Sequence, residues 1–108
     1  MRIEYLDAAL ADLDNITDYY ALTFNVESAY KVYEQIRGSI VRLADYPYSG
    51  VPAKDELLRK LGYKELYSGR FVVIYRVEPQ DNKIFIYHIA DTQTDYPKSF
   101  NNLKIDHK

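Results

Sequence analysis

Cysteine and tryptophan are both absent from the 108 residues of this chain. The absence of cysteine excludes a disulfide framework, cysteine-ligated zinc or iron–sulfur sites and a thiol nucleophile. The two histidines, His88 and His107, are far apart in the sequence, so we expect no His-rich metal site and no cofactor. No apolar run approaches the roughly 20 residues that cross a bilayer, and the N-terminus lacks the apolar stretch of a signal peptide. These absences predict a cytoplasmic protein.

A strong net charge is also lacking, because the formal net charge at pH 7 is −2. Attraction of the whole protein to nucleic acid is therefore not expected. The charges are uneven: residues 1–50 carry four basic and eight acidic side chains, and residues 51–108 carry ten basic and eight acidic ones. We expect an anionic partner to meet the second half, where the candidate target-binding residues are Lys54, Arg59, Lys60, Lys64 and Arg70. The alternative interpretation is a solvated loop, since acidic residues are interspersed among them.

Hydrophobic periodicity predicts two helices in the first half of the chain. Apolar residues recur at steps of three and four along 9–24, which is one face of an amphipathic helix that Asp7 can cap. Asn25 predicts the start of a second helix with an apolar stripe along 29–43. This helix is expected to end near Tyr46, because Pro47 disfavours helical geometry in the residue before it. Two long helices with a short connection should pair antiparallel.

Strand patterns occupy the first six residues and most of the second half. Alternation and β-rich runs predict strands at 1–6, 63–68, 71–77 and 84–90, with a short helical turn in 53–62 and a polar tail over 92–108. The order β-α-α-β-β-β predicts one α+β domain over 1–108, with the helical hairpin on one face of a small, twisted, mainly antiparallel sheet. We expect the other face to stay partly open, as a concave surface lined by long polar side chains.

Several segments resemble motifs of one protein family. Residues 11–20 (ADLDNITDYY) resemble the A-x-x-D-L-x-x-I-x-x-Y opening of the RelE/ParE toxin superfamily, and residues 28–50 resemble its second helix and loop. Residues 69–77 (GRFVVIYRV) resemble its G-x-Y-R-V-I-Y-R-V strand. Residues 84–89, followed by Asp95 and Tyr96, resemble its last strand and R-x-D-Y ending. The resemblance covers about residues 3–97, in the order and spacing of the family.

The resemblance implies a toxin of a bacterial type II toxin–antitoxin module, of the kind often labelled plasmid stabilisation proteins. It implies growth inhibition and an antitoxin, encoded beside the toxin, that wraps and neutralises it. RelE-like members cleave mRNA in the ribosomal A site without metal, whereas ParE-like members poison DNA gyrase and are not nucleases. We expect the antitoxin to lay an amphipathic helix over apolar, Tyr-rich grooves, with candidate contacts at Tyr19, Tyr30, Tyr63 and Tyr67.

Two departures from the RelE-like pattern favour the ParE-like interpretation. RelE-like enzymes resemble one another in using Arg and Lys for charge, but one family arginine position falls on Val72 and a second falls on Gln93 or Thr94. The low net charge favours the same interpretation, because docking on ribosomal RNA benefits from a positive field. We therefore expect a ParE-like toxin that binds a protein target, DNA gyrase.

Two alternatives stay open. A RelE-like nuclease would use a rearranged site of Arg76, His88 and Tyr96, with Arg70 on the same strand face as Arg76. In that site His88 acts as a general acid, and Tyr96 stacks on a base or donates a proton; otherwise His88 makes a structural hydrogen bond and Tyr96 packs against the sheet edge. The second alternative is a degenerate, non-toxic module that only binds its antitoxin.

Overall fold

The computed structural model describes residues 1–93, so Thr94, Tyr96 and most of the expected tail lie outside the described residues. The elements are β1 (Arg2–Tyr5), α1 (Asp7–Thr23), α2 (Val26–Val41), a 3-10 turn (Arg42–Ala44), β2 (Val51–Pro52), α3 (Glu56–Lys60), β3 (Tyr63–Ser68), β4 (Phe71–Glu78), a second 3-10 turn (Pro79–Asp81) and β5 (Lys83–Asp91). The predicted order of helices and strands is confirmed. The expected helical turn is α3, and the short strand β2 is an addition.

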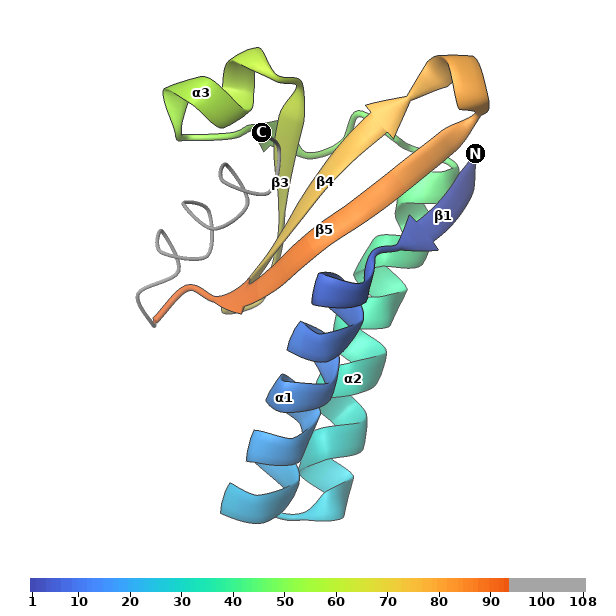
Figure 1. Ribbon diagram of the computed structural model, residues 1–108. Coiled ribbons are helices and arrows are strands. Elements are labelled where there is room, and N and C mark those ends of the chain that lie inside the picture. Colours follow the sequence, from blue (N-terminus) through green and yellow to red (C-terminus); the bar gives the residue numbers. More distant parts are fainter. Residues whose placement is uncertain (94–108) are drawn as a thin grey trace.

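All the strands belong to one sheet, in the order β1-β5-β4-β3-β2. β1 pairs parallel with β5, whereas β5–β4, β4–β3 and β3–β2 are antiparallel. The first and last strands of the described chain therefore lie side by side (Figure 1). The mainly antiparallel sheet is confirmed.

The helical hairpin packs on one face of this sheet and forms the main core with it. α1 and α2 run antiparallel, and their far ends extend beyond the sheet (Figure 1). Leu13 of α1 and Ile36 and Ile40 of α2 are buried against Val73 of β4 and Ile86 of β5. Burial of this apolar stripe stabilises the helices more than their intrinsic propensity does.

The two helix starts differ from one another. Asn25 caps α2 as predicted, because its Oδ1 accepts a hydrogen bond from the Ser28 backbone N–H at 2.7 Å. The expectation that Asp7 caps α1 is wrong. The capping position is Leu6, and Asp7 is the first helical residue, where its negative charge suits the helix N-terminus.

The opposite face of the sheet is less open than expected. α3 and the preceding loop cover part of it, and Ala53 and Leu58 pack there with Val72 and Ile74 of β4 in a second, smaller core. The apolar side chains of β4 therefore point alternately into two cores. The expectation of a concave face lined mainly by long polar side chains is wrong over this area, because Val72 and Ile74 are fully buried.

A bulge in β5 sets which of its side chains face the helices. Ile74 of β4 is paired with His88 and Tyr75 with Ile86, so Tyr87 is an extra residue on β5. The extra residue reverses the alternation of side chains along the strand. Ile86 and Ile89 consequently both join the main core although three positions separate them.

The loop between the helices and β2 is held by a buried tyrosine. The Tyr75 hydroxyl donates to the Pro47 carbonyl at 2.9 Å and accepts from the Gly50 N–H at 3.0 Å. Burial raises the pKa of Tyr75 above that of an ordinary tyrosine. Gly50 has no room for a side chain, because a Cβ there would lie 2.6 Å from the Tyr75 hydroxyl and 2.7 Å from the Glu65 carbonyl.

Candidate functional site

A groove with a volume of about 400 Å³ lies between α1 and the adjoining ends of β4 and β5. We call it the α1 groove. It is lined by Asp12, Asn15, Ile16, Tyr19, Tyr20, Arg70, Phe71, Ile89, Ala90 and Asp91. Apolar and aromatic side chains predominate, with a few polar groups among them, and this is the composition of protein sites that bind partners or ligands.

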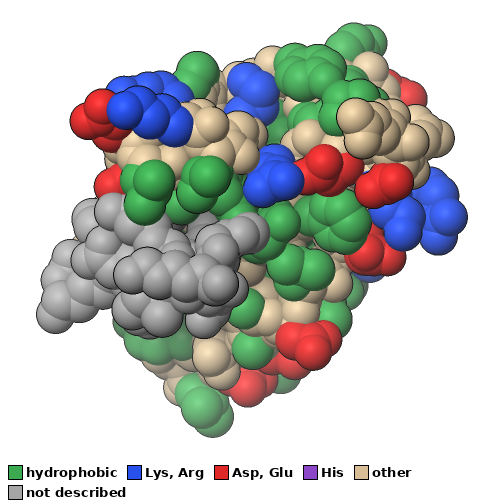
Figure 2. Space-filling model, turned by 45° about the horizontal axis from the view of Figure 1, so that its top comes forward, with side chains coloured by type: hydrophobic (Ala, Val, Ile, Leu, Met, Phe, Trp, Pro, Cys, Tyr) green, Lys and Arg blue, Asp and Glu red, His purple; other side chains and the backbone are tan. Residues whose placement is uncertain are grey.

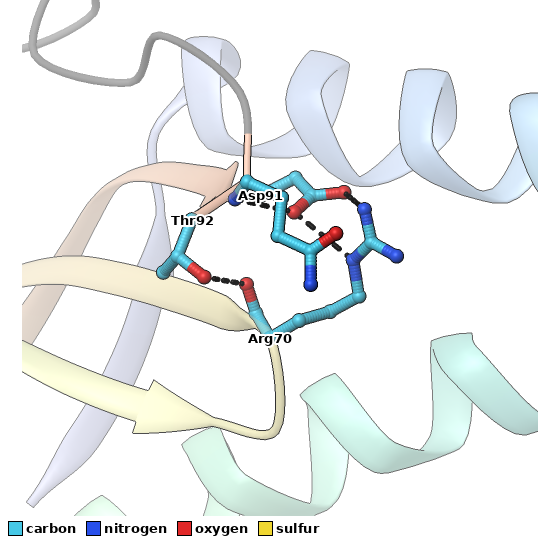
Figure 3. A network of polar contacts seen from close by, with 4 residues as sticks. Arg70, Asp91 and Thr92 are labelled. Carbon is cyan, nitrogen blue, oxygen red and sulfur yellow. Dashed lines mark hydrogen bonds and ion pairs between the residues drawn. The ribbon is translucent and has the colours of Figure 1, made fainter.

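An ion pair forms part of the lining of the α1 groove. Gly69 has a left-handed backbone conformation (φ +59°) in the turn before β4, where Arg70 follows it. Arg70 donates from Nε to Asp91 Oδ1 at 3.0 Å and from Nη2 to Asp91 Oδ2 at 2.5 Å (Figure 3). These hydrogen bonds raise the pKa of Arg70 above that of an ordinary arginine. The Thr92 N–H and hydroxyl both donate to the Arg70 carbonyl at 2.7 Å, which joins the chain after β5 to this turn.

The other part of the α1 groove is tied to β5 through Asp12. Its Oδ2 accepts from the Ile89 N–H at 2.9 Å and lies 2.7 Å from His88 Nδ1. β1 pairs with β5 only as far as Ile86, so the edge of β5 beyond that residue lacks a neighbouring strand. The Asp12 carboxylate supplies the missing acceptor from a helix. His88 Nδ1 and the Ile89 N–H therefore share one carboxylate oxygen of Asp12.

Comparisons with known proteins agree with this architecture. The profile of the family described as "ParE toxin of type II toxin-antitoxin system, parDE" matches residues 3–96. The chain belongs to the ParE toxin family. It is 38% identical over 80 residues to Toxin ParE1 of Caulobacter vibrioides, which is 74% of this chain and 80% of that protein. The expected ParE-like membership of the RelE/ParE superfamily is confirmed, and with it the identity as a toxin of a toxin–antitoxin system.

Solved structures show the same fold. The chromosomal ParDE TA system from P. aeruginosa superimposes with a TM-score of 0.72 and 25% identity, over 86% of this chain and 97% of that chain. The RelBE2 toxin–antitoxin complex from Mycobacterium tuberculosis has a TM-score of 0.63 at 15% identity, over 83% of this chain and 95% of that chain. The isolated E. coli RelE toxin has a TM-score of 0.60 at 12% identity, over 96% of this chain and 97% of that chain. At these lower identities the likeness concerns the fold, which confirms the predicted fold class.

In this ParE-family toxin one of the predicted basic residues, Arg70, lies apart from the other four. Arg70 lies in the turn at the far end of β3 from α3, and its side chain turns towards α1. Arg59 Nη1 donates to the Ala53 and Lys54 carbonyls at 3.2 Å, and Lys60 pairs with Glu56 at 3.1 Å. Figure 2 shows the basic side chains of this side of the molecule separated by acidic and apolar ones.

A buried carboxylate joins two of the predicted residues near α3. Glu65 is fully buried; its Oε1 accepts from the Tyr67 hydroxyl at 2.7 Å and its Oε2 from the Lys54 N–H at 3.1 Å. The Lys54 ammonium lies 5.5 Å from the Tyr67 ring centroid. We call Glu65, Tyr67 and Lys54 the Glu65 cluster. Sequence reasoning missed Glu65; the available signal was its place between Tyr63 and Tyr67 on one face of β3.

The residues of the predicted nuclease site have different neighbours. Arg76 donates to Glu78 at 2.6 Å and stacks over the Tyr63 ring at 5.6 Å. His88 instead contacts Asp12 of α1. Within residues 1–93, no hydrogen bond or ion pair joins Arg76 to His88. Arg70 and Arg76 are also separated, because Arg70 precedes β4 and lines the α1 groove.

The four predicted antitoxin contacts differ in exposure. Tyr19, Tyr30 and Tyr67 are 58%, 64% and 42% exposed. Tyr63 is 1% exposed, because its ring belongs to the second core, so it offers no surface to a partner in this conformation.

The helices within residues 1–93 include none with the length and apolar character of a membrane span. The same residues contain no cluster of acidic or histidine side chains able to hold a metal ion.

Proposed function

We propose that this toxin inhibits growth by binding DNA gyrase in the cytoplasm, and that its antitoxin neutralises it by covering part of its surface. The observation that supports a binding toxin over a nuclease is that the candidate catalytic side chains are paired with carboxylates of the chain itself. Arg70, Arg76 and His88 each contact a carboxylate of the chain itself, namely Asp91, Glu78 and Asp12. Val72, at the family arginine position, is fully buried.

Metal-free RNA cleavage needs several groups around one phosphate: a base for the 2′-hydroxyl, positive charge for the phosphorane and an acid for the leaving oxygen. Here Arg76 and His88 contact different elements, and the ion pairs offset the charge that a phosphate would require. Binding to a protein target does not need several catalytic groups around one phosphate. A nuclease using Arg76, His88 and Tyr96 is the competing function.

The target-binding surface that we propose is the end of the molecule around α3. Lys54, Lys60 and Lys64 place their charges there, and Arg59 lies in the last turn of α3. The ammonium of Lys64 lies 5.9 Å from the Tyr48 ring centroid and that of Lys54 lies 5.5 Å from the Tyr67 ring centroid, so two cations lie beside exposed aromatic rings on this surface. Such a surface suits an acidic protein segment with apolar side chains. Arg70 does not belong to it.

An antitoxin partner is supported by the relatives, since the P. aeruginosa and M. tuberculosis structures are of a ParDE system and of a toxin–antitoxin complex. In this chain the exposed Tyr19, Tyr30 and Tyr67 are the proposed contacts. Exposed tyrosines are frequent at protein interfaces, because each has an apolar ring and a polar tip.

The test is induced expression of the full chain without antitoxin, with two measurements in the same cells. A gyrase poison produces DNA breaks and an SOS response while mRNA stays intact. Cleavage at ribosome-phased codons, mapped by primer extension and lost in Arg76→Ala or His88→Ala, would establish the nuclease instead. Normal growth with neither signal would leave only a degenerate, antitoxin-binding module.

A further inference from the structure

The lysines of the chain differ in whether a carboxylate offsets their charge. Within residues 1–93, the lysines that form ion pairs are Lys31, Lys60 and Lys83. No ion pair reaches the ammonium of Lys54 or Lys64 in that part of the chain. Each of these two lies instead beside an exposed tyrosine ring, that of Tyr67 for Lys54 and that of Tyr48 for Lys64. The positive charge of both lysines is therefore left for a partner.

The backbone of Lys54 is held on both sides. Its N–H donates to Glu65 Oε2 at 3.1 Å, and its carbonyl accepts from Arg59 Nη1 at 3.2 Å. The next residue, Asp55, caps α3 by accepting from the Leu58 N–H at 3.0 Å. The Lys54 backbone is thus fixed to β3 and to α3, while its side chain is exposed. A side chain that starts from a fixed backbone loses less conformational freedom when it binds.

The carboxylate that binds the Lys54 backbone also binds the ring under the Lys54 ammonium. Glu65 is fully buried, and its Oε1 accepts from the Tyr67 hydroxyl at 2.7 Å. One carboxylate therefore holds both members of the cation–aromatic pair. The face of the ring attracts the ammonium electrostatically, so it restricts the position of the ammonium while the N–H donors can still bind an acceptor.

The neighbouring charges indicate what kind of anion would bind. Asp55 and Glu56 directly follow Lys54, and Glu56 is exposed. A nucleic-acid strand needs several cations along its row of phosphates, and these carboxylates would repel it. A single carboxylate needs only one cation, and an ammonium forms a strong, charge-assisted hydrogen bond with it. An aspartate or glutamate side chain of a protein fits this position better than a nucleic acid does.

We propose that Lys54 binds an aspartate or glutamate side chain of the target, and that Glu65 is the positioning residue that holds Lys54 and Tyr67 for this contact. The inference rests on the target-binding surface proposed around α3. Glu65 does not touch the target itself, because it is fully buried. Lys60 contributes less than Lys54, because Glu56 offsets its charge.

The positioning role is tested without any ligand, by NMR of the purified full chain. The ring current of Tyr67 should shift the methylene protons next to the Lys54 ammonium upfield. Glu65→Gln should keep this shift, because the amide can accept from the Lys54 N–H and donate to the Tyr67 oxygen. Glu65→Met, of similar length but without an acceptor, should lose it. The same shift in both variants would overturn the positioning role.

A second variant covers the case in which Glu65→Met does not fold by circular dichroism. Tyr67→Phe keeps the ring and removes only the hydroxyl that Glu65 binds. It should reduce the upfield shift at Lys54 and weaken the binding measured below. An unchanged shift together with unchanged binding would overturn the positioning role.

The binding test uses two fluorescein-labelled peptides of about 14 residues. They share their leucine positions, and the remaining positions are glutamate in one and glutamine in the other. We expect fluorescence anisotropy to give at least about fivefold tighter binding of the glutamate peptide. Lys54→Ala should weaken that binding about tenfold, and Lys31→Ala, an equal charge change at an exposed lysine of α2, by less than about twofold. Equal binding of the two peptides, or equal effects of these two variants, would overturn the proposal.

A double-mutant cycle separates positioning from a general effect on stability. Glu65→Met should weaken binding of the glutamate peptide about as much as Lys54→Ala, and Glu65→Gln by less than about twofold. The double variant with Lys54→Ala and Glu65→Met should bind no more weakly than either single variant, because both changes remove the same contact. Additive losses would mean that Glu65 does not act through Lys54.

Three further outcomes distinguish the possible failures. Tighter binding of a labelled single-stranded RNA than of the glutamate peptide, lost in Lys54→Ala, would assign the position to phosphate and overturn the proposal. A chain that gives the expected peptide results but does not inhibit gyrase supercoiling would refute the proposed target alone. Inhibition of gyrase that Lys54→Ala and Glu65→Met leave unchanged would refute this inference and leave the proposed target standing.

Discussion

The α1 groove and the Glu65 cluster both use a carboxylate to connect distant segments, but in different surroundings. Glu65 is fully buried, and the groups that it binds are a loop N–H and a tyrosine hydroxyl. In the α1 groove the Arg70 and Asp91 side chains are 42% and 16% exposed. A buried acceptor is costly to remove because its partners lose their hydrogen bonds. A partly exposed ion pair adds little stability, so its main effect is on the charge of the surface.

One region therefore holds the fold, and the other can change its charge without unfolding. The Glu65 cluster positions the loop that leads into α3, and with it the proposed target-binding lysines. The α1 groove has an apolar floor within the main core, and its rim consists of side chains that can be replaced. Four changes test this division.

The largest effect is expected from Glu65→Ala. The Lys54 N–H and the Tyr67 hydroxyl both lose their acceptor, and a cavity remains on the side of the sheet that α3 covers. We expect a loss of about 3 kcal/mol in the free energy of unfolding, measured by urea denaturation. Glu56→Ala is the control, because the Lys60–Glu56 pair is exposed and contributes less than about 0.5 kcal/mol. Equal effects would mean that Glu65 does not hold the loop.

Two glycine substitutions test the same loop without changing any charged side chain. Gly50→Ala places a methyl group against the Tyr75 hydroxyl and the Glu65 carbonyl and should cost about 2 kcal/mol. Gly38→Ala, inside α2 with nothing within 4 Å of the added methyl, should stabilise by about 1 kcal/mol. Thermal denaturation of both variants gives the sign. A stabilising Gly50→Ala would contradict the close approach of Tyr75.

Asp12→Ala tests the connection between α1 and β5. The Ile89 N–H and His88 lose their shared acceptor, so we expect a loss of about 1.5 kcal/mol. Hydrogen exchange at Ile89 should accelerate more than at Ile86, whose β1 contacts remain. The control is Asp14→Ala, an exposed aspartate of the same helix, for which we expect a change within about 0.5 kcal/mol. Unchanged exchange at Ile89 would contradict the edge contact.

Arg70→Gln should have the smallest effect on stability. The Arg70–Asp91 pair is partly exposed, and we expect a change of about 0.5 kcal/mol or less in urea denaturation. The Thr92 contacts to the Arg70 backbone carbonyl do not depend on the side chain. A loss as large as that of Glu65→Ala would remove the distinction between the two regions.

Local patterns in the sequence were sufficient for most of the elements. The α1 and α2 stripes, the Asn25 cap and the three long strands each depend on residues close together in the chain, which is why periodicity and capping rules find them. The hairpin and the order of elements followed from short connections. The start of α1 was misplaced by one residue, because Asp7 suits both a cap and a first turn.

The candidate sites depend on contacts between distant residues, which local patterns do not contain. Tyr63 and Tyr67 are equivalent by alternation, yet Tyr63 is buried and Tyr67 is exposed, because the second core covers only one end of β3. Arg70 was expected to follow the alternation of β4, but it lies in the turn before the strand. The bulge at Tyr87 likewise reverses the side chains after it.

The α+β class, the helical hairpin, the strand meander and the resemblance to RelE/ParE toxins could all be predicted from the sequence, because these depend on patterns within segments. Only the packed structure shows that β1 lies beside β5, that Asp12 completes the edge of β5, that Glu65 joins Lys54 to Tyr67, and that Arg70 lines the α1 groove. The physical reason is that burial, hydrogen-bond satisfaction and ion pairing are settled between segments only when the sheet and the helices pack together.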